Sequence, residues 1–127
     1  MKCVDSDFLI AVLRGEEDAL PVIEELDDEG GCTTAISIFE LYVGAHLTRR
    51  EHLIETERLL SRFSILSLEG DSARLAGRIF ADLVRKGKSI DIKDALIAGI
   101  VLNSGTTLIT RNTEHFKNVR GLKIGVW

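Results

Sequence analysis

The chain alternates short β-prone runs with longer amphipathic helical runs along its whole length, and this alternation restricts the fold more than any other feature. Such an alternation is typical of a parallel sheet covered by helices, because each parallel strand needs a crossover connection to reach the next. The pattern predicts strands at residues 2–4, 32–35, 65–68 and 107–110, with a fifth at 122–126 on the sheet edge. It predicts helices at residues 8–14, 17–28, 51–62, 71–86 and 91–104, and another that starts at Ser37. We therefore expect a three-layer α/β fold, with a mostly parallel central sheet of four to five strands flanked by helices.

The length of 127 residues suits one domain and is too small for two independent cores. Hydrophobic residues make up 45% of the chain, which is enough to build a core and excludes intrinsic disorder. Cys3 and Cys32 are too few for a disulfide framework or a zinc site, so we expect both to be small buried side chains. The apolar runs are far shorter than the roughly 20 residues that span a bilayer, and the N-terminus lacks a secretory pattern. We expect a single domain over residues 1–127, located in the cytoplasm and without a membrane partner.

The acidic and basic residues are distributed unevenly. Residues 1–40 hold 11 Asp and Glu against 2 Lys and Arg, a net charge of -9, whereas residues 41–127 hold 9 against 14, a net charge of +5. The overall charge of -4 argues against a dedicated nucleic-acid binder, but the later part of the chain carries cations that suit phosphate contacts. Several lie on or after one predicted helix: Arg74, Arg78, Arg85, Lys86, Lys88 and Lys93. Either they form a solvated helix face or they contact RNA.

Four polar residues lie where strands end or helices begin. Asp5 follows the first predicted strand directly, and Glu40 lies just past the second. Asp94 is one turn into an apolar helix, and Asn112 follows the fourth strand. Because parallel strands gather their carboxyl ends at one edge of the sheet, these side chains are expected to meet in one crevice. Arg111 adjoins Asn112, so we expect it to contact the substrate there.

Three of these residues also have a purely structural interpretation. Asp5 suits the N-cap of a helix, Glu40 completes a capping box with Ser37, and Asn112 is common in turns. Asp94 has no such role, because Asp91 is the natural N-cap of that helix. A partly buried acid without a capping role is costly unless a cation offsets its desolvation.

Three carboxylates in one crevice repel one another unless they are protonated or share a cation. Oxygen ligands without a Cys or His cluster favour hard ions such as Mg2+ or Mn2+. Such an ion suits phosphoryl transfer or phosphodiester hydrolysis, because it lowers the pKa of a bound water and neutralises charge that develops on the phosphate.

Four short motifs occur in order along the chain: D-S-x-x-L-I at 5–10, S-x-x-E-L-x-x-G at 37–44, D-A-L-I-A at 94–98 and T-R-N-T-x-H-F at 110–116. In this order and spacing they resemble the motifs of PIN-domain ribonucleases, and most closely those of VapC-type toxins from prokaryotic toxin-antitoxin pairs. The resemblance extends over essentially the whole chain. It implies a single PIN-like domain with endoribonuclease activity on RNA, a homodimer or higher homo-oligomer, and neutralisation by a cognate antitoxin protein.

The resemblance also implies roles for individual residues. Asp5, Glu40 and Asp94 match the acidic site that holds Mg2+ or Mn2+, with Asp5 and Asp94 as the direct ligands. Asn112 matches a fourth position that is Asp in many relatives. One negative charge is therefore lost, and the number of bound ions, one or two, stays open. Ser6 matches a hydroxyl position beside the first acid and is expected to orient a ligand or water.

Other interpretations stay open at this stage. In one, the chain is a catalytically weak PIN-like module that binds RNA or protein, with Asn112 as the sign of lost activity. In another, Asp5 and Asp7 begin a small-molecule phosphatase in which Asp5 is the nucleophile. A metal-free mechanism needs a His pair, but only His115 of the three histidines is expected near the crevice. Val12, Val43 and Leu47 belong either to the core or to a partner surface.

Overall fold

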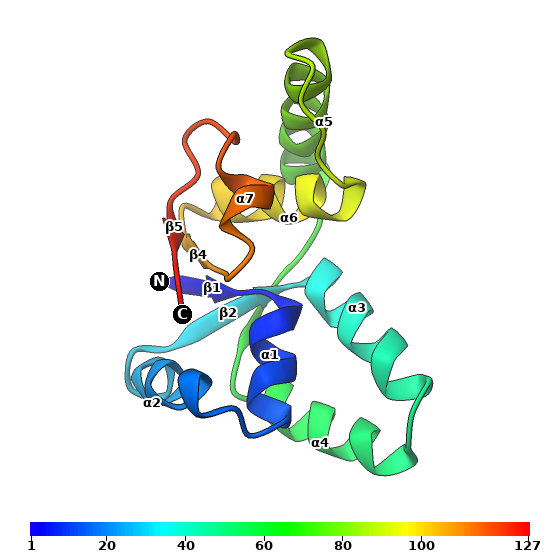
Figure 1. Cartoon of the computed structure of the whole chain (residues 1–127), viewed down its shortest axis with the longest axis vertical. Coiled ribbons are helices and arrows are strands. Elements are labelled where there is room, and N and C mark those ends of the chain that lie inside the picture. The colour runs from blue at the N-terminus through cyan, green and yellow to red at the C-terminus, as the bar shows by residue number, and fades with distance from the viewer.

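Five parallel strands form the central sheet in the order β3-β2-β1-β4-β5 (Figure 1). The computed structural model describes residues 1–127. The strands are β1 (Lys2–Val4), β2 (Gly31–Thr34), β3 (Ser64–Leu66), β4 (Thr107–Ile109) and β5 (Ile124–Gly125). In the central strand, Cys3 pairs with Cys32 of β2 on one side and with Leu108 of β4 on the other. The predicted parallel sheet, with its fifth strand at the edge, is confirmed.

Helices cover both faces of this sheet (Figure 1). They are α1 (Ser6–Leu13), the 3-10 helix η1 (Glu17–Ala19), α2 (Leu20–Glu29), α3 (Ala35–His46), α4 (Arg50–Leu60), α5 (Gly70–Arg85), α6 (Ile92–Ser104) and α7 (Thr113–Phe116). Successive strand residues point to opposite faces, so Val4 packs with α1 to α4 while Cys3 packs with α5 to α7. The result is the three-layer α/β fold expected from the sequence. No helix combines the length and the apolar character that a membrane crossing needs.

Several helix starts differ from the prediction, and in two helices the N-cap residue differs as well. Helix α3 begins at Ala35 because Thr34 is its N-cap, and the Thr34 side chain accepts a hydrogen bond from the Ser37 backbone N–H at 3.1 Å. The predicted capping box of Ser37 with Glu40 is therefore wrong, and Glu40 is left free for other contacts. Similarly, α5 is capped by Glu69 and not by Asp71.

Helices α5 and α6 approach each other most closely at Gly99 of α6. A β-carbon built on Gly99 would lie 2.7 Å from the Ala76 β-carbon and 2.7 Å from the Ser72 carbonyl oxygen. These distances are shorter than carbon atoms tolerate, so only glycine permits this spacing. The contact matters for function because α6 carries Asp94 in its first turn.

Candidate active site

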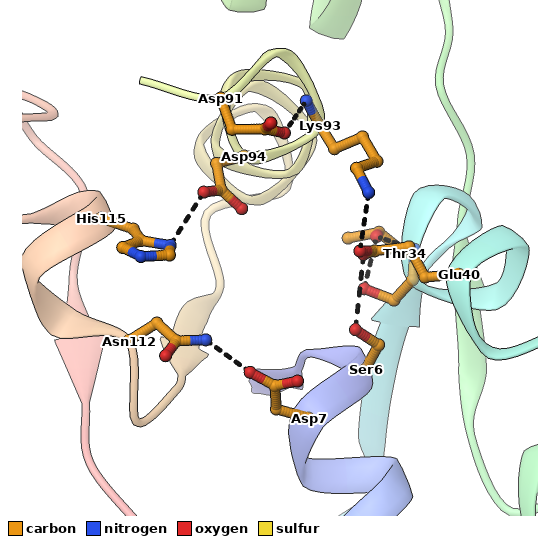
Figure 2. A network of polar contacts seen from close by, with 10 residues as sticks. Ser6, Asp7, Thr34, Glu40, Asp91, Lys93, Asp94, Asn112 and His115 are labelled. Carbon is orange, nitrogen blue, oxygen red and sulfur yellow. Dashed lines mark hydrogen bonds and ion pairs between the residues drawn. The ribbon is translucent and has the colours of Figure 1, made fainter. Parts of the chain in front are cut away.

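A cleft of about 280 Å³ opens at the carboxyl end of the sheet. Its walls come from the starts of α1, α6 and α7 and from the second turn of α3, as Figure 2 shows. The lining residues are Asp5, Ser6, Asp7, Glu40, Asp91, Lys93, Asp94, Ile97, Asn112, His115 and Phe116. The structure thus brings together Asp5, Glu40, Asp94 and Asn112, as well as Ser6, from segments far apart in the chain.

Asp5 follows β1 directly and is only 5% exposed. One carboxylate oxygen accepts the Phe8 backbone N–H at 3.1 Å, which makes Asp5 the N-cap of α1. The other oxygen accepts the Thr110 hydroxyl at 2.6 Å. Burial raises the pKa of the Asp5 carboxyl above its ordinary value, although both hydrogen bonds act in the opposite direction. Asp5 therefore fulfils the capping role while it also borders the cleft.

Asp94 is half-buried in the first turn of α6, and its Oδ2 lies 3.1 Å from Nδ1 of His115. The cap of this helix is Asp91, whose carboxylate accepts the Lys93 backbone N–H at 2.8 Å. Burial raises the pKa of Asp94, while the neighbouring His115 lowers it. Asp94 is therefore a partly desolvated acid that does not cap the helix, as the sequence indicated.

Glu40 lies across the cleft on α3 and contacts two polar side chains. Its Oε1 accepts a hydrogen bond from the Ser6 hydroxyl at 3.4 Å, and its Oε2 lies 3.5 Å from the Lys93 ammonium nitrogen (Figure 2). Lys93 is the one Lys or Arg that lines the cleft. A single cation therefore faces an otherwise strongly acidic surface.

Asn112 donates a hydrogen bond from its side-chain amide to Asp7 at 2.5 Å (Figure 2). An ionised aspartate has no hydrogen to donate, so the same position occupied by Asp would place two carboxylates against each other. The amide thus matches Asp7 in this chain. Asn112 and Asp7 are therefore complementary as a hydrogen-bonded pair.

The predicted position of Arg111 is wrong, because its side chain does not line the cleft. Its guanidinium carbon lies 3.6 Å from the centre of the Trp127 ring. The same group pairs with Asp18 at 3.1 Å and with Glu16 at 3.8 Å. This stacked and paired arrangement engages the Arg111 guanidinium with Trp127, Asp18 and Glu16.

The donor set of the cleft suits a hard divalent cation. It is dominated by carboxylate oxygens, and two of these carboxylates have pKa values raised by burial that a cation would lower again. No three Asp, Glu, His or Cys side chains converge closely enough to hold an ion in their present orientations. The acids instead face Thr110, His115, Lys93 and Asn112. The residues therefore fit Mg2+ or Mn2+ by chemistry, and these protein donors compensate the charge of the carboxylates.

Comparison with known proteins identifies the family. The model of the PIN domain family matches residues 2–122. The chain belongs to the PIN-domain family. It is 27% identical over 126 residues to the tRNA(fMet)-specific endonuclease VapC of Salmonella typhimurium, covering 98% of this chain and 96% of the relative. It is 33% identical over 98 residues to Ribonuclease VapC3 of Methanocaldococcus jannaschii, covering 76% and 94%.

Solved structures show the same PIN fold. The crystal structure of DNA-bound VapBC from Salmonella typhimurium matches with a TM-score of 0.90 at 26% identity, covering 99% of this chain and 97% of the matched chain. The resemblance to the VapC branch of the PIN family, stated on four motifs, is therefore confirmed over nearly the whole chain.

Four polar residues of the PIN-domain cleft lie outside the set of site residues predicted from the sequence: Asp7, Asp91, Lys93 and His115. Each lies within three positions of a residue that was predicted. Asp7 and Lys93 are neighbours of Ser6 and Asp94, and His115 follows Asn112 by one helical turn. For Asp91 and His115 the three-residue spacing from Asp94 and Asn112 was an available signal, because residues one turn apart share a helix face. For Asp7 and Lys93 the only signal was adjacency to Ser6 and Asp94.

The raised pKa of Asp5 predicts a pH dependence of stability for this PIN domain. An acid whose pKa is higher in the folded than in the unfolded state contributes stability that is complete below its ordinary pKa of 3.8, and this contribution is lost as pH rises through the folded-state pKa. We therefore expect Asp5→Asn to gain stability relative to the parent between pH 4 and pH 7, measured by urea unfolding without divalent ions. Glu24→Gln, which removes an exposed charge, is the control. A difference between the parent and Asp5→Asn that stays constant with pH would contradict the expected effect of burial.

Proposed function

We propose that this PIN domain is a Mg2+- or Mn2+-dependent endoribonuclease that hydrolyses RNA phosphodiester bonds with a metal-activated water, and that it is the toxin of a VapBC-type toxin-antitoxin pair. The observation that carries the proposal is the meeting of Asp5, Glu40, Asp94 and Asn112 in one acidic cleft. Relatives that match almost the full chain are named VapC ribonucleases or endonucleases, which supports RNA as the substrate.

Each cleft residue has a proposed task. Asp5 and Asp94 hold the ion, and Glu40 adds negative charge from the opposite wall. When bound, the ion supplies an activated water and neutralises charge on the phosphate. The Asn112 amide and the Ser6 hydroxyl orient water or substrate by hydrogen bonds. Thr110 fixes the Asp5 carboxylate by its 2.6 Å hydrogen bond, so that this acid needs little reorganisation.

The proposal is tested by removing and restoring the metal. A chelator is expected to reduce RNA cleavage to background, and excess Mg2+ or Mn2+ to restore it. Because a ligand that binds only the folded state stabilises it, Mg2+ at about 100 times its Kd should add about 2.7 kcal/mol to the free energy of unfolding. Calcium-free, magnesium-free buffer with matched ionic strength is the control. Full cleavage in chelator would reject the metal-dependent mechanism.

Lys93 takes the substrate-contacting role that the sequence assigned to Arg111. It is the one Lys or Arg in the cleft, and its ammonium group is placed at the far wall by Glu40. Approach of an RNA phosphate would give this ammonium a second anionic partner beside the proposed metal ligands.

We expect Lys93→Gln to raise the KM for RNA by about 3- to 10-fold and to reduce the salt dependence of binding by about one phosphate contact, a change of roughly 0.7 in the logarithmic slope for single strands. Lys93→Arg should retain most of the parent affinity, since the charge is kept. Lys123→Gln, an exposed lysine outside the cleft, serves as the matched control. An unchanged slope in Lys93→Gln would remove Lys93 from the proposed phosphate contact.

Partners are proposed from the structural relatives. Solved VapBC structures contain a chain of this fold together with its partner, which supports an antitoxin partner for this protein. A homodimer or higher homo-oligomer is supported by the apolar side chains exposed on α3 and at its C-cap, of which Phe39 is 61% and Leu47 81% exposed. The PIN-family match favours the nuclease over the phosphatase. The names of the relatives, endonuclease and ribonuclease, favour an active enzyme over a module that has lost its activity.

A further inference from the structure

A second cavity lies near the C-terminal end of α6. It has a volume of about 330 Å³ and is bordered by α5, by the later part of α6 and by the segment that follows α7. Its floor is apolar and includes Leu75, Leu83 and Val119. Three cationic side chains line it: Arg78, Lys86 and Arg120. The single acid among the lining residues is Asp82.

The three cations of this cavity are available to a ligand. Their side chains are exposed and take part in none of the ion pairs or side-chain hydrogen bonds of the structure. In contrast, Arg74 and Arg85 of the same helix are paired with Asp71 and Asp82. The structure therefore divides the basic residues of α5 into those that neutralise neighbouring acids and those that border the cavity without a partner. Since Asp82 is engaged by Arg85, the net charge presented by the cavity is positive.

The spacing of the cations suits an extended polyanion. Arg78 and Lys86 are eight residues apart on α5, which corresponds to roughly 12 Å along the helix axis, and Arg120 lies on the opposite wall. A single phosphate is much smaller than this separation. A nucleic-acid strand, in contrast, places more than one phosphate within such a distance. Arg and Lys are the side chains that proteins use to position such backbones.

The cavity and the acidic cleft are built partly from the same elements. Helix α6 contributes Asp94 to the cleft and Leu102 to the cavity, and the chain then passes from His115 in the cleft to Arg120 in the cavity. Helix α6 and the α7 segment thus connect the walls of the cleft to the walls of the cavity.

We infer that the cavity of Arg78, Lys86 and Arg120 binds backbone phosphates of the substrate RNA at a distance from the cleaved bond. This inference rests on the proposed nuclease function. It assigns to the cavity the affinity for RNA that the acidic cleft cannot supply through charge.

The inference is tested by comparing two triple variants of equal charge. Arg78→Gln, Lys86→Gln and Arg120→Gln are combined in one protein. Arg49→Gln, Arg50→Gln and Arg58→Gln are combined in the control, which removes three exposed cations of α4 and its N-cap that also lack ion pairs. Binding of a fluorescent single-stranded RNA of about 20 nucleotides is measured in chelator, where the RNA is not cut, at several salt concentrations.

We expect the cavity variant to bind the RNA at least about 10-fold more weakly at 0.1 M salt, and its logarithmic salt slope to fall by about 2, because three phosphate contacts contribute roughly 0.7 each. The control should change by less than about 3-fold. With Mg2+, the cavity variant should cut the long RNA more slowly at limiting concentrations, yet cut a four-nucleotide RNA as fast as the parent.

Three results would overturn the inference. Equal losses in the two triple variants would show a general charge effect. Parent-like RNA binding by the cavity variant would leave an acidic protein segment as the occupant. Full competition by inorganic phosphate at constant ionic strength would assign the cavity to a single anion. If the parent cuts no RNA with any divalent ion, the proposed function fails. The RNA affinities of the two triple variants, measured in chelator, still test whether the cavity binds RNA.

Discussion

Asp94→Asn is expected to lower the rate of RNA cleavage by more than about 100-fold while the protein stays folded. The carboxylate of Asp94 is half-buried beside His115 and does not cap α6, and in the proposed mechanism it is a direct ligand of the ion. Asparagine has nearly the same shape but a neutral side chain that binds a divalent ion weakly. Loss of a direct ligand should exceed the 10- to 100-fold effect typical of residues that only support a ligand. Single-turnover cleavage of a labelled RNA measures the change.

Asp91→Asn is the matched control for this experiment. It removes the same charge from the same helix, three residues earlier, and Asn caps a helix about as well as Asp. We expect cleavage by Asp91→Asn within about 10-fold of the parent and an unchanged circular dichroism spectrum for both variants. The Mg2+-induced rise in Tm should persist in Asp91→Asn and disappear in Asp94→Asn. Equal cleavage by Asp94→Asn and the parent would reject the proposed mechanism.

Gly99→Ala is expected to destabilise the protein by about 2 kcal/mol. Overpacking a tight contact costs about 1–3 kcal/mol, and here two of the three nearest atoms, the Ser72 carbonyl oxygen and the Ala76 backbone nitrogen, are backbone atoms that cannot rotate away. The higher helix propensity of alanine offsets about 1 kcal/mol of this destabilisation. For a chain of this size the change corresponds to a fall in Tm of about 8 °C.

Gly77→Ala should stabilise the protein and is the control for Gly99→Ala. Gly77 also lies inside a helix, but a β-carbon there meets no atom within 4 Å. We therefore expect only the gain in helix propensity, about 1 kcal/mol, and a higher Tm. Thermal unfolding of both variants, followed by circular dichroism, separates helix propensity from the α5–α6 contact. A stabilised Gly99→Ala would show that the two helices can move apart at little cost.

The sequence was sufficient for the sheet and for the residues that directly follow its strands. Asp5 and Asn112 could be placed because the carboxyl ends of parallel strands share one edge, whatever the exact register. Asp94 could be singled out because Asp91 already accounted for the cap. These inferences depend on short-range pattern and on a general property of parallel sheets.

The direction of exposed side chains could not be predicted in the same way. Arg111 turns away from the cleft because Trp127 and Asp18 hold it, and neither partner is near it in the sequence. The start of α3 was misplaced because Thr34 and Ser37 are both good N-caps, and the choice depends on where β2 ends against its neighbours. Tertiary contacts decided both cases.

The central position of β1 has a consequence for the time at which the protein becomes active during its synthesis. The first strand of the chain must pair with β4, and Asp5 must meet Thr110, 105 residues later. Ribosomes add about 5–20 residues per second, so for several seconds a growing chain holds Asp5 and Glu40 but lacks the elements that complete the cleft. In the proposed nuclease the cleft therefore stays incomplete until almost the whole chain has been made.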